Sequence, residues 1–351
     1  MTQGRTHASS RPRIAVCDDY ERSLAFGADW DTIRSRAGVV VFDRPFGSRQ
    51  QAIEALADFD AVCLVRERTP FPAAVVDDLP RLKFVVFTGE RNLAFDHLAA
   101  ARRGIPVSFT PFGPSKSSTA ELTWALILAA TKRVTMADTG IRRGHWRGDA
   151  HGMPYPLPAN LEGERLGLVG LGQIGARVAA VGRVFGMEVV AWSPNLDDAR
   201  AQAGGARRVS KEELFETSAV VSLHLVLSDR TRGIVGAGDL ARMRSDAVLV
   251  NTSRAALVDE AALLDALARG RPGLAALDVF GVEPLPAGSP VLSLPNVVLT
   301  PHLGYVNDKV FAAFRQGMAD ALLAWLDGEP IRLVNAEQLA ARNSAAPGDA
   351  A

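Results

Sequence analysis

The feature that most constrains this chain is a glycine-rich turn, Gly170–Gly175, which reads GLGQIG. It follows an apolar run, Leu166–Val169, and opens a stretch of small and apolar residues that stops at Gly186, where a left-handed C-cap is expected. This order predicts a strand, a tight turn and a helix, an arrangement that binds dinucleotide phosphates at the helix N-terminus, where unpaired N–H groups and the helix dipole favour negative charge. The first glycine makes the turn, the second lets backbone approach the pyrophosphate, and the third allows close helix-to-strand packing. A glycine turn with a purely structural role is the alternative interpretation.

Length and charge narrow the class of protein. A chain of 351 residues is too long for one ordinary core, so two domains are expected. Lysine plus arginine and aspartate plus glutamate number 39 each, and this balance gives no field that would attract nucleic acid or an anionic membrane. No apolar run approaches the roughly 20 residues that a bilayer requires. We therefore expect a small-molecule partner.

The N-terminus and the cysteines indicate a cytoplasmic protein. Residues Met1–Arg13 are polar and basic without a hydrophobic segment, which predicts a loose arm rather than a secretory signal; a transit peptide is the alternative. Cys17 and Cys63 are each flanked by strand-like apolar residues. Buried free thiols in a reducing compartment therefore fit better than a disulfide or a metal site.

Two series of short apolar runs alternate with helical stretches, which predicts the α/β class with two Rossmann-like or flavodoxin-like doubly wound domains and parallel sheets. The first series is Ile14–Cys17, Val39–Phe42, Ala61–Val65, Phe84–Phe87 and Pro106–Phe109. The second series is Leu166–Val169, Glu188–Trp192, Ala219–Leu223, Ala247–Asn251, Leu274–Val279 and Val297–Thr300.

The end of the chain is expected to return to the first domain. A helix at about Asp308–Leu326 and a short run, Ile331–Val334, follow the second series, and the tail after Asn335 is expected to fray. The first domain is then discontinuous. The expected boundaries are residues 1–117 and 302–351 for a substrate domain and 118–301 for an inserted cofactor domain.

The segment between the two series predicts a subunit contact. Ser118 and Glu121 match a capping box, and Leu122–Ala130 is apolar all round, so the helix must be buried on every side. It therefore crosses between domains or lies in a subunit interface. Together with Thr139–Pro158, read as an arm or long loop, it predicts a homodimer.

Three polar groups follow strands of the second series. Arg254 follows Ala247–Asn251, Glu283 lies just past Leu274–Val279, and His302 follows Val297–Thr300. Because carboxyl ends of parallel strands meet at one edge of a sheet, the three side chains can converge. Arginine holds a carboxylate through two prongs and polarises the neighbouring carbonyl, histidine exchanges a proton near neutral pH, and a glutamate beside it favours the imidazolium. Each residue alone also has a non-catalytic interpretation: Arg254 as a solvated side chain, Glu283 as a turn residue and His302 as a structural histidine.

With these residues, the chain resembles the D-isomer specific 2-hydroxyacid dehydrogenases, in the branch that is similar to phosphoglycerate dehydrogenase. The resemblance runs from Ile14 to about Asn335. It rests on GLGQIG, VSLHLVLSDRTRGIVG from Val221, LVNTSRAALVDEAAL from Leu249, ALDVFGVEPLP from Ala276 and NVVLTPHLGY from Asn296.

The resemblance implies roles for individual residues. Arg254, Glu283 and His302 would be catalytic, and Asp278 would hydrogen-bond the nicotinamide carboxamide. The loop Thr88–Asn92 would bind the substrate carboxylate, largely through backbone N–H groups. The expected substrate contacts are Arg66, Thr88, Gly89 and Arg254. The expected cofactor contacts are Gly170, Gly172, Gln173, Ile174, Gly175, Ser193, His224, Thr231, Thr252, Asp278 and Gly304.

Two departures from the family pattern matter. Ala255 and Ala256 stand where glycine and proline commonly follow the catalytic arginine. Ser193 stands where many members carry the aspartate that selects NAD over NADP. Because Asp197 and Asp198 would repel a 2′-phosphate, we expect NAD, with NADP possible.

Several other functions are compatible with parts of this pattern. A cofactor-sensing binding protein similar to the C-terminal binding protein corepressors would keep the same three polar residues. Formate dehydrogenases of the family carry glutamine in place of Glu283, which argues against formate or phosphite oxidation, and a methyltransferase would not need the three convergent groups. His145 and His151 have no partners at metal-ligand spacing, so no metal is expected. The loops Arg66–Pro72 and Phe109–Ser117 carry no signature that selects one 2-hydroxy acid.

Overall fold

The computed structural model describes residues 11–147 and 156–345. The chain forms two compact units, one made of Met1–Pro114 with Asp308–Ala351 and the other of Ser115–Asn307. We call them unit 1 and unit 2. The sequence-based boundaries, after residues 117 and 301, differ from these by a few residues, and His302 consequently lies in unit 2. The described residues contain no helix that is both long and apolar enough to cross a membrane.

Unit 1 is built on a five-stranded parallel sheet in the order β2-β1-β3-β4-β5, the flavodoxin order. Its strands are β1 (Arg13–Val16), β2 (Gly38–Val41), β3 (Ala61–Leu64), β4 (Phe84–Phe87) and β5 (Val107–Phe109). Its helices are α1 (Ala28–Arg36), α2 (Arg49–Leu56), α3 (Ala73–Asp77), α4 (His97–Arg102), α12 (Asp308–Leu326) and α13 (Ala336–Ala345). Both cysteines are free and buried in this unit.

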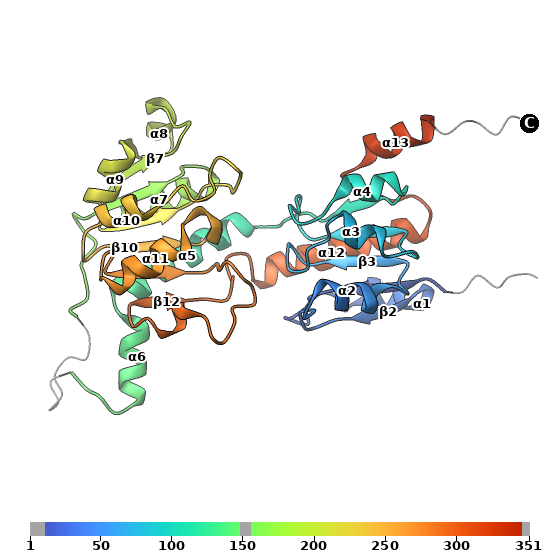
Figure 1. Cartoon of the computed structure of the whole chain (residues 1–351), viewed down its shortest axis with the longest axis horizontal. Helices are drawn as coiled ribbons and strands as arrows, with labels where there is room; N and C mark the ends of the chain where they lie inside the picture. The colour runs from blue at the N-terminus through green and yellow to red at the C-terminus, as the bar shows by residue number, and fades with distance from the viewer. Residues whose placement is uncertain (1–10, 148–155, 346–351) are drawn as a thin grey trace, which may run out of the picture. The chain divides into compact units, whose positions relative to one another are not determined.

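The C-terminal segment packs within unit 1, where Figure 1 shows α12 in orange among the blue and teal N-terminal elements. The ring of Trp325 on α12 stacks on Phe84 of β4 with centroids 5.3 Å apart. Asn335 is fully buried and accepts a hydrogen bond from Val107 N at 3.0 Å. The expectation that the chain frays after Asn335 is wrong, because Ala336–Ala345 forms α13.

Unit 2 contains a seven-stranded parallel sheet in the order β12-β11-β10-β9-β6-β7-β8, a doubly wound arrangement. Its strands are β6 (Arg165–Val169), β7 (Glu188–Trp192), β8 (Arg207–Arg208), β9 (Val220–Leu223), β10 (Val248–Asn251), β11 (Leu274–Leu277) and β12 (Val297–Leu299). Its helices are α5 (Ser115–Thr131), α6 (Val134–Arg142), α7 (Gln173–Val184), α8 (Asp198–Ala203), α9 (Lys211–Thr217), α10 (Ala237–Arg242), α11 (Glu260–Ala268), η1 (Ala255–Leu257) and η2 (Pro290–Ser293). The predicted α/β class with two parallel sheets is confirmed.

Both faces of the unit 2 sheet are covered by helices. Leu168 of β6 packs into one core with Trp124 of α5 and Val178 of α7. Its neighbour Val169 packs into the opposite core with Leu249. Burial on both faces explains why these strands appear in the sequence as continuous apolar runs.

Helix α5 differs from the prediction in two respects. It begins at Ser115, directly after Pro114, so Ser118 and Glu121 lie inside the helix and do not cap it. Proline has no N–H and a helix-compatible φ, which favours a start at this point. Moreover, Glu121 and Ala125 are exposed, so the helix is not buried on every side of a single chain.

The expected arm contains more regular structure than predicted. Helix α6 (Val134–Arg142) takes up the start of the segment Thr139–Pro158. Its middle, including His151, lies outside the described residues.

Candidate functional site

The glycine-rich turn joins β6 to α7. Gly170 has φ +102°, and a Cβ added to it would lie 2.8 Å from the carbonyl oxygen of His224. A Cβ on Gly175 would collide with the Gly170 carbonyl oxygen, whereas one on Gly172 would meet nothing within 4 Å. The first hydrogen bond of the helix runs from Ala176 N to Gly172 O at 2.9 Å. The backbone N–H groups before Ala176 therefore come before the hydrogen-bonded part of the helix. This geometry fits a dinucleotide pyrophosphate at the start of α7.

The turn after β7 lacks a carboxylate at the position that would meet the adenosine ribose. Ser193 is half-buried, and its carbonyl accepts a bond from Leu196 N at 3.2 Å. Asp197 is committed to capping α8, since its Oδ1 accepts from Arg200 N at 2.8 Å. Asp198 lies 3.6 Å from Arg208. Both expected repelling acids therefore already have partners on the protein.

The turn after β9 holds the other expected adenosine contacts. His224 Nε2 lies 2.9 Å from Ser222 Oγ, and burial lowers the His224 pKa to about 4. The ring is therefore neutral at pH 7, which suits packing against a cofactor better than proton exchange. Thr231 Oγ1 donates to Val226 O at 2.8 Å and accepts from Ser228 N at 2.7 Å, so this hydroxyl shapes its own loop.

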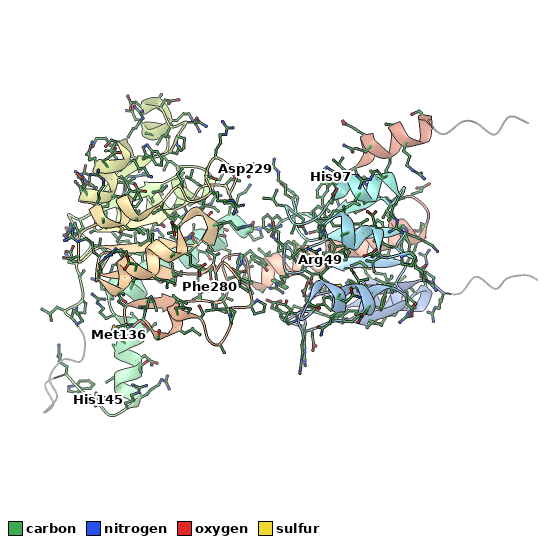
Figure 2. All side chains as sticks on the ribbon, viewed as in Figure 1. Arg49, His97, Met136, His145, Asp229 and Phe280 are labelled. Carbon is green, nitrogen blue, oxygen red and sulfur yellow. The ribbon has the colours of Figure 1, made fainter. Side chains whose placement is uncertain are left out.

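The central feature of the site is a contact between Glu283 and His302. Glu283 Oε2 lies 2.6 Å from His302 Nδ1, and the side chains are 35% and 29% exposed. The other oxygen, Oε1, accepts a bond at 2.8 Å from the backbone N–H of Phe280, which is labelled in Figure 2. Burial raises the pKa of Glu283, but the hydrogen bond and charge of His302, the Phe280 N–H and the charge of Arg254 outweigh burial and lower it. Glu283 is therefore a carboxylate at neutral pH.

The loop that carries His302 is fastened to Asp278 at the end of β11. Oδ1 of this fully buried carboxylate accepts from Thr300 Oγ1 at 2.6 Å and from Leu303 N at 2.7 Å, and Oδ2 accepts from Gly304 N at 2.9 Å. Burial raises the pKa of Asp278 against the opposing effect of these bonds and of the His302 charge. His302 has φ +56°, a left-handed conformation that histidine rarely adopts. In addition to any contact with a cofactor, Asp278 thus holds the Thr300 side chain before His302 and the backbone after it.

The loop that carries Arg254 is organised by Asn251. Asn251 Oδ1 accepts from Ser253 N, and its Nδ2 donates to Arg254 O, each at 3.0 Å. Ser253 Oγ donates to Leu225 O at 2.6 Å, which ties this loop to the one after β9. Ala255–Leu257 then forms the short helix η1, so the two alanines that depart from the family pattern still make a regular turn.

Sequence reasoning missed hydroxyl groups that hold the two loops. Thr119 Oγ1 lies 3.0 Å from Gly304 O, and Thr123 Oγ1 lies 2.8 Å from Thr252 Oγ1. The one signal available was the spacing of the two threonines, which places them on the same side of a helix.

In unit 1, the predicted substrate loop is organised around Arg66. This side chain is buried, and its Nη1 donates to Thr88 O at 2.9 Å and to Arg91 O at 3.1 Å. Its guanidinium lies 4.4 Å above the ring centre of Phe112. Gly89 has φ +81°, and its N–H donates to Thr110 Oγ1 at 2.9 Å. Arg66 therefore shapes the loop, and the Gly89 N–H is bonded to Thr110 within the protein.

Comparison with known proteins decides the family. Residues 124–304 match the family model described as "D-isomer specific 2-hydroxyacid dehydrogenase, NAD binding domain". A glyoxylate reductase from Aeropyrum pernix is 39% identical over 275 residues, which cover 76% of this chain and 81% of that protein. The chain belongs to the D-isomer specific 2-hydroxyacid dehydrogenases.

Other relatives of this dehydrogenase agree. A D-3-phosphoglycerate dehydrogenase from Archaeoglobus fulgidus is 32% identical, and the match covers 81% of this chain and 53% of that protein. A crystal structure of a phosphoglycerate oxidoreductase from Vibrio cholerae O395 superposes with a TM-score of 0.83 and 36% identity, covering 90% of this chain and 99% of that one. The predicted family, enzyme class and NAD(P) cofactor are confirmed. The enzymatic names of these relatives favour turnover over the sensing alternative.

The geometry of this dehydrogenase suits proton exchange beside a carboxylate-binding group. A carboxylate oxygen 2.6 Å from Nδ1 places a proton on that nitrogen, which leaves Nε2 of His302 to exchange a proton with a ligand. The charge of Arg254 makes the smallest of the contributions that lower the Glu283 pKa. Among the described residues, no cluster of three His, Cys, Asp or Glu side chains could hold a metal ion.

Proposed function

We propose that this dehydrogenase reduces a small 2-oxo acid to the D-2-hydroxy acid, reversibly, with NADH preferred over NADPH. The observation that carries the proposal is the 2.6 Å contact between Glu283 Oε2 and His302 Nδ1 in the unit that holds the glycine-rich turn. When bound, the reduced nicotinamide supplies the hydride that adds to C2 of the acid. His302 Nε2 gives its proton to the carbonyl oxygen, and in the reverse direction takes it back.

The remaining catalytic roles follow from the chemistry of each group. Arg254 binds the substrate carboxylate through two N–H groups and polarises the neighbouring carbonyl. Glu283 holds the His302 ring in place through Nδ1.

Unit 2 is proposed to bind the cofactor. Its pyrophosphate lies at the N-terminus of α7. The residues assigned to the cofactor are Gly170, Gly172, Gln173, Ile174, Gly175, Ser193, His224, Thr231, Thr252, Asp278 and Gly304. Ser193 offers a hydroxyl to the ribose in place of an acid, so the proposed preference for NADH rests on the carboxylates of Asp197 and Asp198, in addition to their contacts with the start of α8 and with Arg208.

Unit 1 is proposed to recognise the acid through the loop Thr88–Asn92, with Arg66 holding this loop in shape. We place glyoxylate and hydroxypyruvate first among the substrates. A glyoxylate reductase from Korarchaeum cryptofilum is 37% identical over 297 residues, and a hydroxypyruvate reductase from Blautia hydrogenotrophica is 29% identical over 327 residues.

A cytoplasmic homodimer completes the proposal. The two free cysteines are buried, which suits a reducing compartment, and Val134 and Ile141 on α6 are each 52% exposed, which suits a subunit contact. Light scattering should give twice the 37.4 kDa chain mass, and a monomer at micromolar concentration would contradict this part.

The function is tested by the absorbance of reduced nicotinamide, with NADH and separately NADPH, across glyoxylate, hydroxypyruvate, pyruvate and phenylpyruvate. We expect oxidation of NADH with glyoxylate and hydroxypyruvate, and loss of turnover in His302→Ala and Arg254→Ala with NADH affinity retained. Unchanged rates in either variant would refute the assigned mechanism. Tight NADH binding without oxidation by any acid would instead favour a sensing protein.

A further inference from the structure

Helix α5 carries two threonines one turn apart that reach different catalytic loops of unit 2. Thr119 Oγ1 lies 3.0 Å from Gly304 O in the loop of His302. Thr123 Oγ1 lies 2.8 Å from Thr252 Oγ1 in the loop of Arg254. One rigid element therefore contacts both segments that present the proposed proton donor and the proposed carboxylate-binding group.

The direction of these hydrogen bonds follows from the acceptors. Thr123 Oγ1 also lies 2.8 Å from the carbonyl of Thr119, which can only accept, so the single proton of Thr123 is used there. Thr252 must then donate to Thr123. The hydroxyl of Thr119 is shared between Gly304 O and the carbonyl of Ser115 at 2.9 Å.

The contact to Gly304 bears on the conformation of His302. Gly304 N is held by Asp278 at 2.9 Å, and its carbonyl is held by Thr119 at 3.0 Å, so the peptide groups on both sides of Gly304 are fixed. The left-handed backbone of His302, at φ +56°, is two residues upstream. A strained conformation persists only where neighbouring contacts determine it, and the contacts at Gly304 lie in the same loop.

The contact to Thr252 bears on Arg254 in the same way. Thr123 is fully buried and Thr252 is 6% exposed, so water does not compete for this pair. Removing the Thr123 hydroxyl would leave the Thr252 hydroxyl without its acceptor in a buried place, which costs more than losing an exposed bond. The loop would relax to find another acceptor, and Arg254 lies two residues further along the chain.

We propose that Thr119 and Thr123 are positioning residues, which set the spacing between His302 and Arg254 by fastening both loops to α5. The proposal rests on the proposed function, since these two side chains matter together only if one binds and the other protonates the same acid.

Matched variants separate hydroxyl positioning from general stability. Thr119→Val and Thr123→Val keep the side-chain shape and remove the hydroxyl. Thr131→Val is the control, because Thr131 lies on α5, is 4% exposed and hydrogen-bonds only within the helix, to Ile127 O at 2.8 Å, among its described side-chain bonds. We expect kcat to fall roughly 3- to 10-fold in the first two variants, the ratio that a net hydrogen bond corresponds to. KM for NADH should stay within twofold, and Thr131→Val should match the wild type.

Restoration by serine distinguishes the hydroxyl from the methyl group. Thr119→Ser and Thr123→Ser should return kcat to within about twofold of wild type because one hydrogen bond accounts for the loss. Should Thr123→Val fail to fold, Thr123→Ala removes the same hydroxyl with less bulk and takes its place. Failure of the serine variants to restore kcat would assign the effect to packing and overturn the proposal.

A second readout does not depend on turnover. Nitrogen-15 histidine labelling gives imidazole signals, and the His302 signal is identified by its loss in His302→Gln. Thr119→Val should displace the His302 signal, whereas Thr131→Val should leave it unchanged. If the wild type turned over no 2-oxo acid, the proposed function would fail while this measurement still decided the positioning of His302. Identical behaviour of Thr119→Val and Thr131→Val in both measurements would overturn the inference.

Discussion

Replacing Glu283 by glutamine removes one charge from the pair with His302 and preserves its shape. The two side chains meet at 2.6 Å and are 35% and 29% exposed. Opposite unit charges about 4 Å apart attract by about 4 kcal/mol at an effective dielectric constant of about 20. Because water reaches about a third of each side chain, we halve this value, and glutamine keeps a neutral hydrogen bond to Nδ1. A loss of about 1–2 kcal/mol remains, which corresponds to roughly a 5- to 30-fold decrease in kcat/KM for reduction.

The assay is the initial rate of NADH oxidation by glyoxylate or hydroxypyruvate at low ionic strength. Glu164→Gln is the matched control, because Glu164 forms an ion pair of similar exposure in the same unit, 2.9 Å from Arg244, with side chains 37% and 35% exposed. That variant should keep kcat/KM within twofold. Equal losses in the two variants, or less than a twofold loss in Glu283→Gln, would refute the electrostatic reasoning.

The same pair predicts a pH dependence of stability. The pKa of Glu283 is lowered from its ordinary value of 4.5 in the folded protein. A carboxyl group with a lowered pKa stabilises the fold above its unfolded pKa, and this contribution is lost as the pH falls through the folded pKa. The difference in melting temperature between wild type and Glu283→Gln should therefore be present at about pH 5 and shrink as the pH falls below it. A difference that grew on acidification would contradict the assignment.

Three further substitutions test the other parts of the site. Arg254→Lys keeps the charge but loses the two-pronged geometry, and we expect kcat/KM to fall by roughly 10- to 100-fold with NADH affinity retained by fluorescence. Gly175→Ala places a Cβ against the Gly170 carbonyl, so denaturant titration should show a loss of about 1–3 kcal/mol in the free energy of unfolding, and NADH binding should weaken. Ser193→Asp adds the missing ribose acid and should raise the NADH-to-NADPH ratio of kcat/KM by at least about tenfold, whereas an unchanged ratio would place the selection elsewhere.

The fold could be predicted from the sequence wherever burial leaves a pattern. Strand Phe84–Phe87 is buried along its whole length, so its run of four apolar residues predicted both ends of the strand correctly. Strand β8 consists of the exposed residues Arg207 and Arg208, which carry no apolar signal, and it was missed. The start of α5 was misplaced because a local capping pattern at Ser118 was given more weight than Pro114.

The proposed catalytic side chains could be predicted from the sequence more readily than the residues that hold them in place. Glutamate and histidine after neighbouring strands predicted the pairing of Glu283 with His302, since both leave the same sheet edge. The bond between Thr119 and Gly304 joins residues 185 positions apart, and no local pattern encodes it. The left-handed backbone of His302 was also unpredictable, because histidine adopts it only when tertiary contacts determine it.

The division of the chain into units has a consequence for biosynthesis. Unit 2 is one unbroken stretch, Ser115–Asn307, whereas unit 1 needs both ends of the chain. During translation, β4 is made long before α12, which supplies the Trp325 ring that stacks on Phe84. About 240 residues separate the end of β5 from the end of α13, a delay of about 10–50 s at roughly 5–20 residues per second.

The strands of unit 1 are therefore translated first but are the last to gain all of their packing partners. Unit 2 should fold during translation while the N-terminal part of unit 1 still exposes apolar surface. We therefore expect chaperones to bind that part of the chain. Released chains that end at Asn307 should show protease-resistant unit 2 and a cleavable N-terminal segment. Resistance of both at that length would mean that the sheet of unit 1 closes without its C-terminal helices.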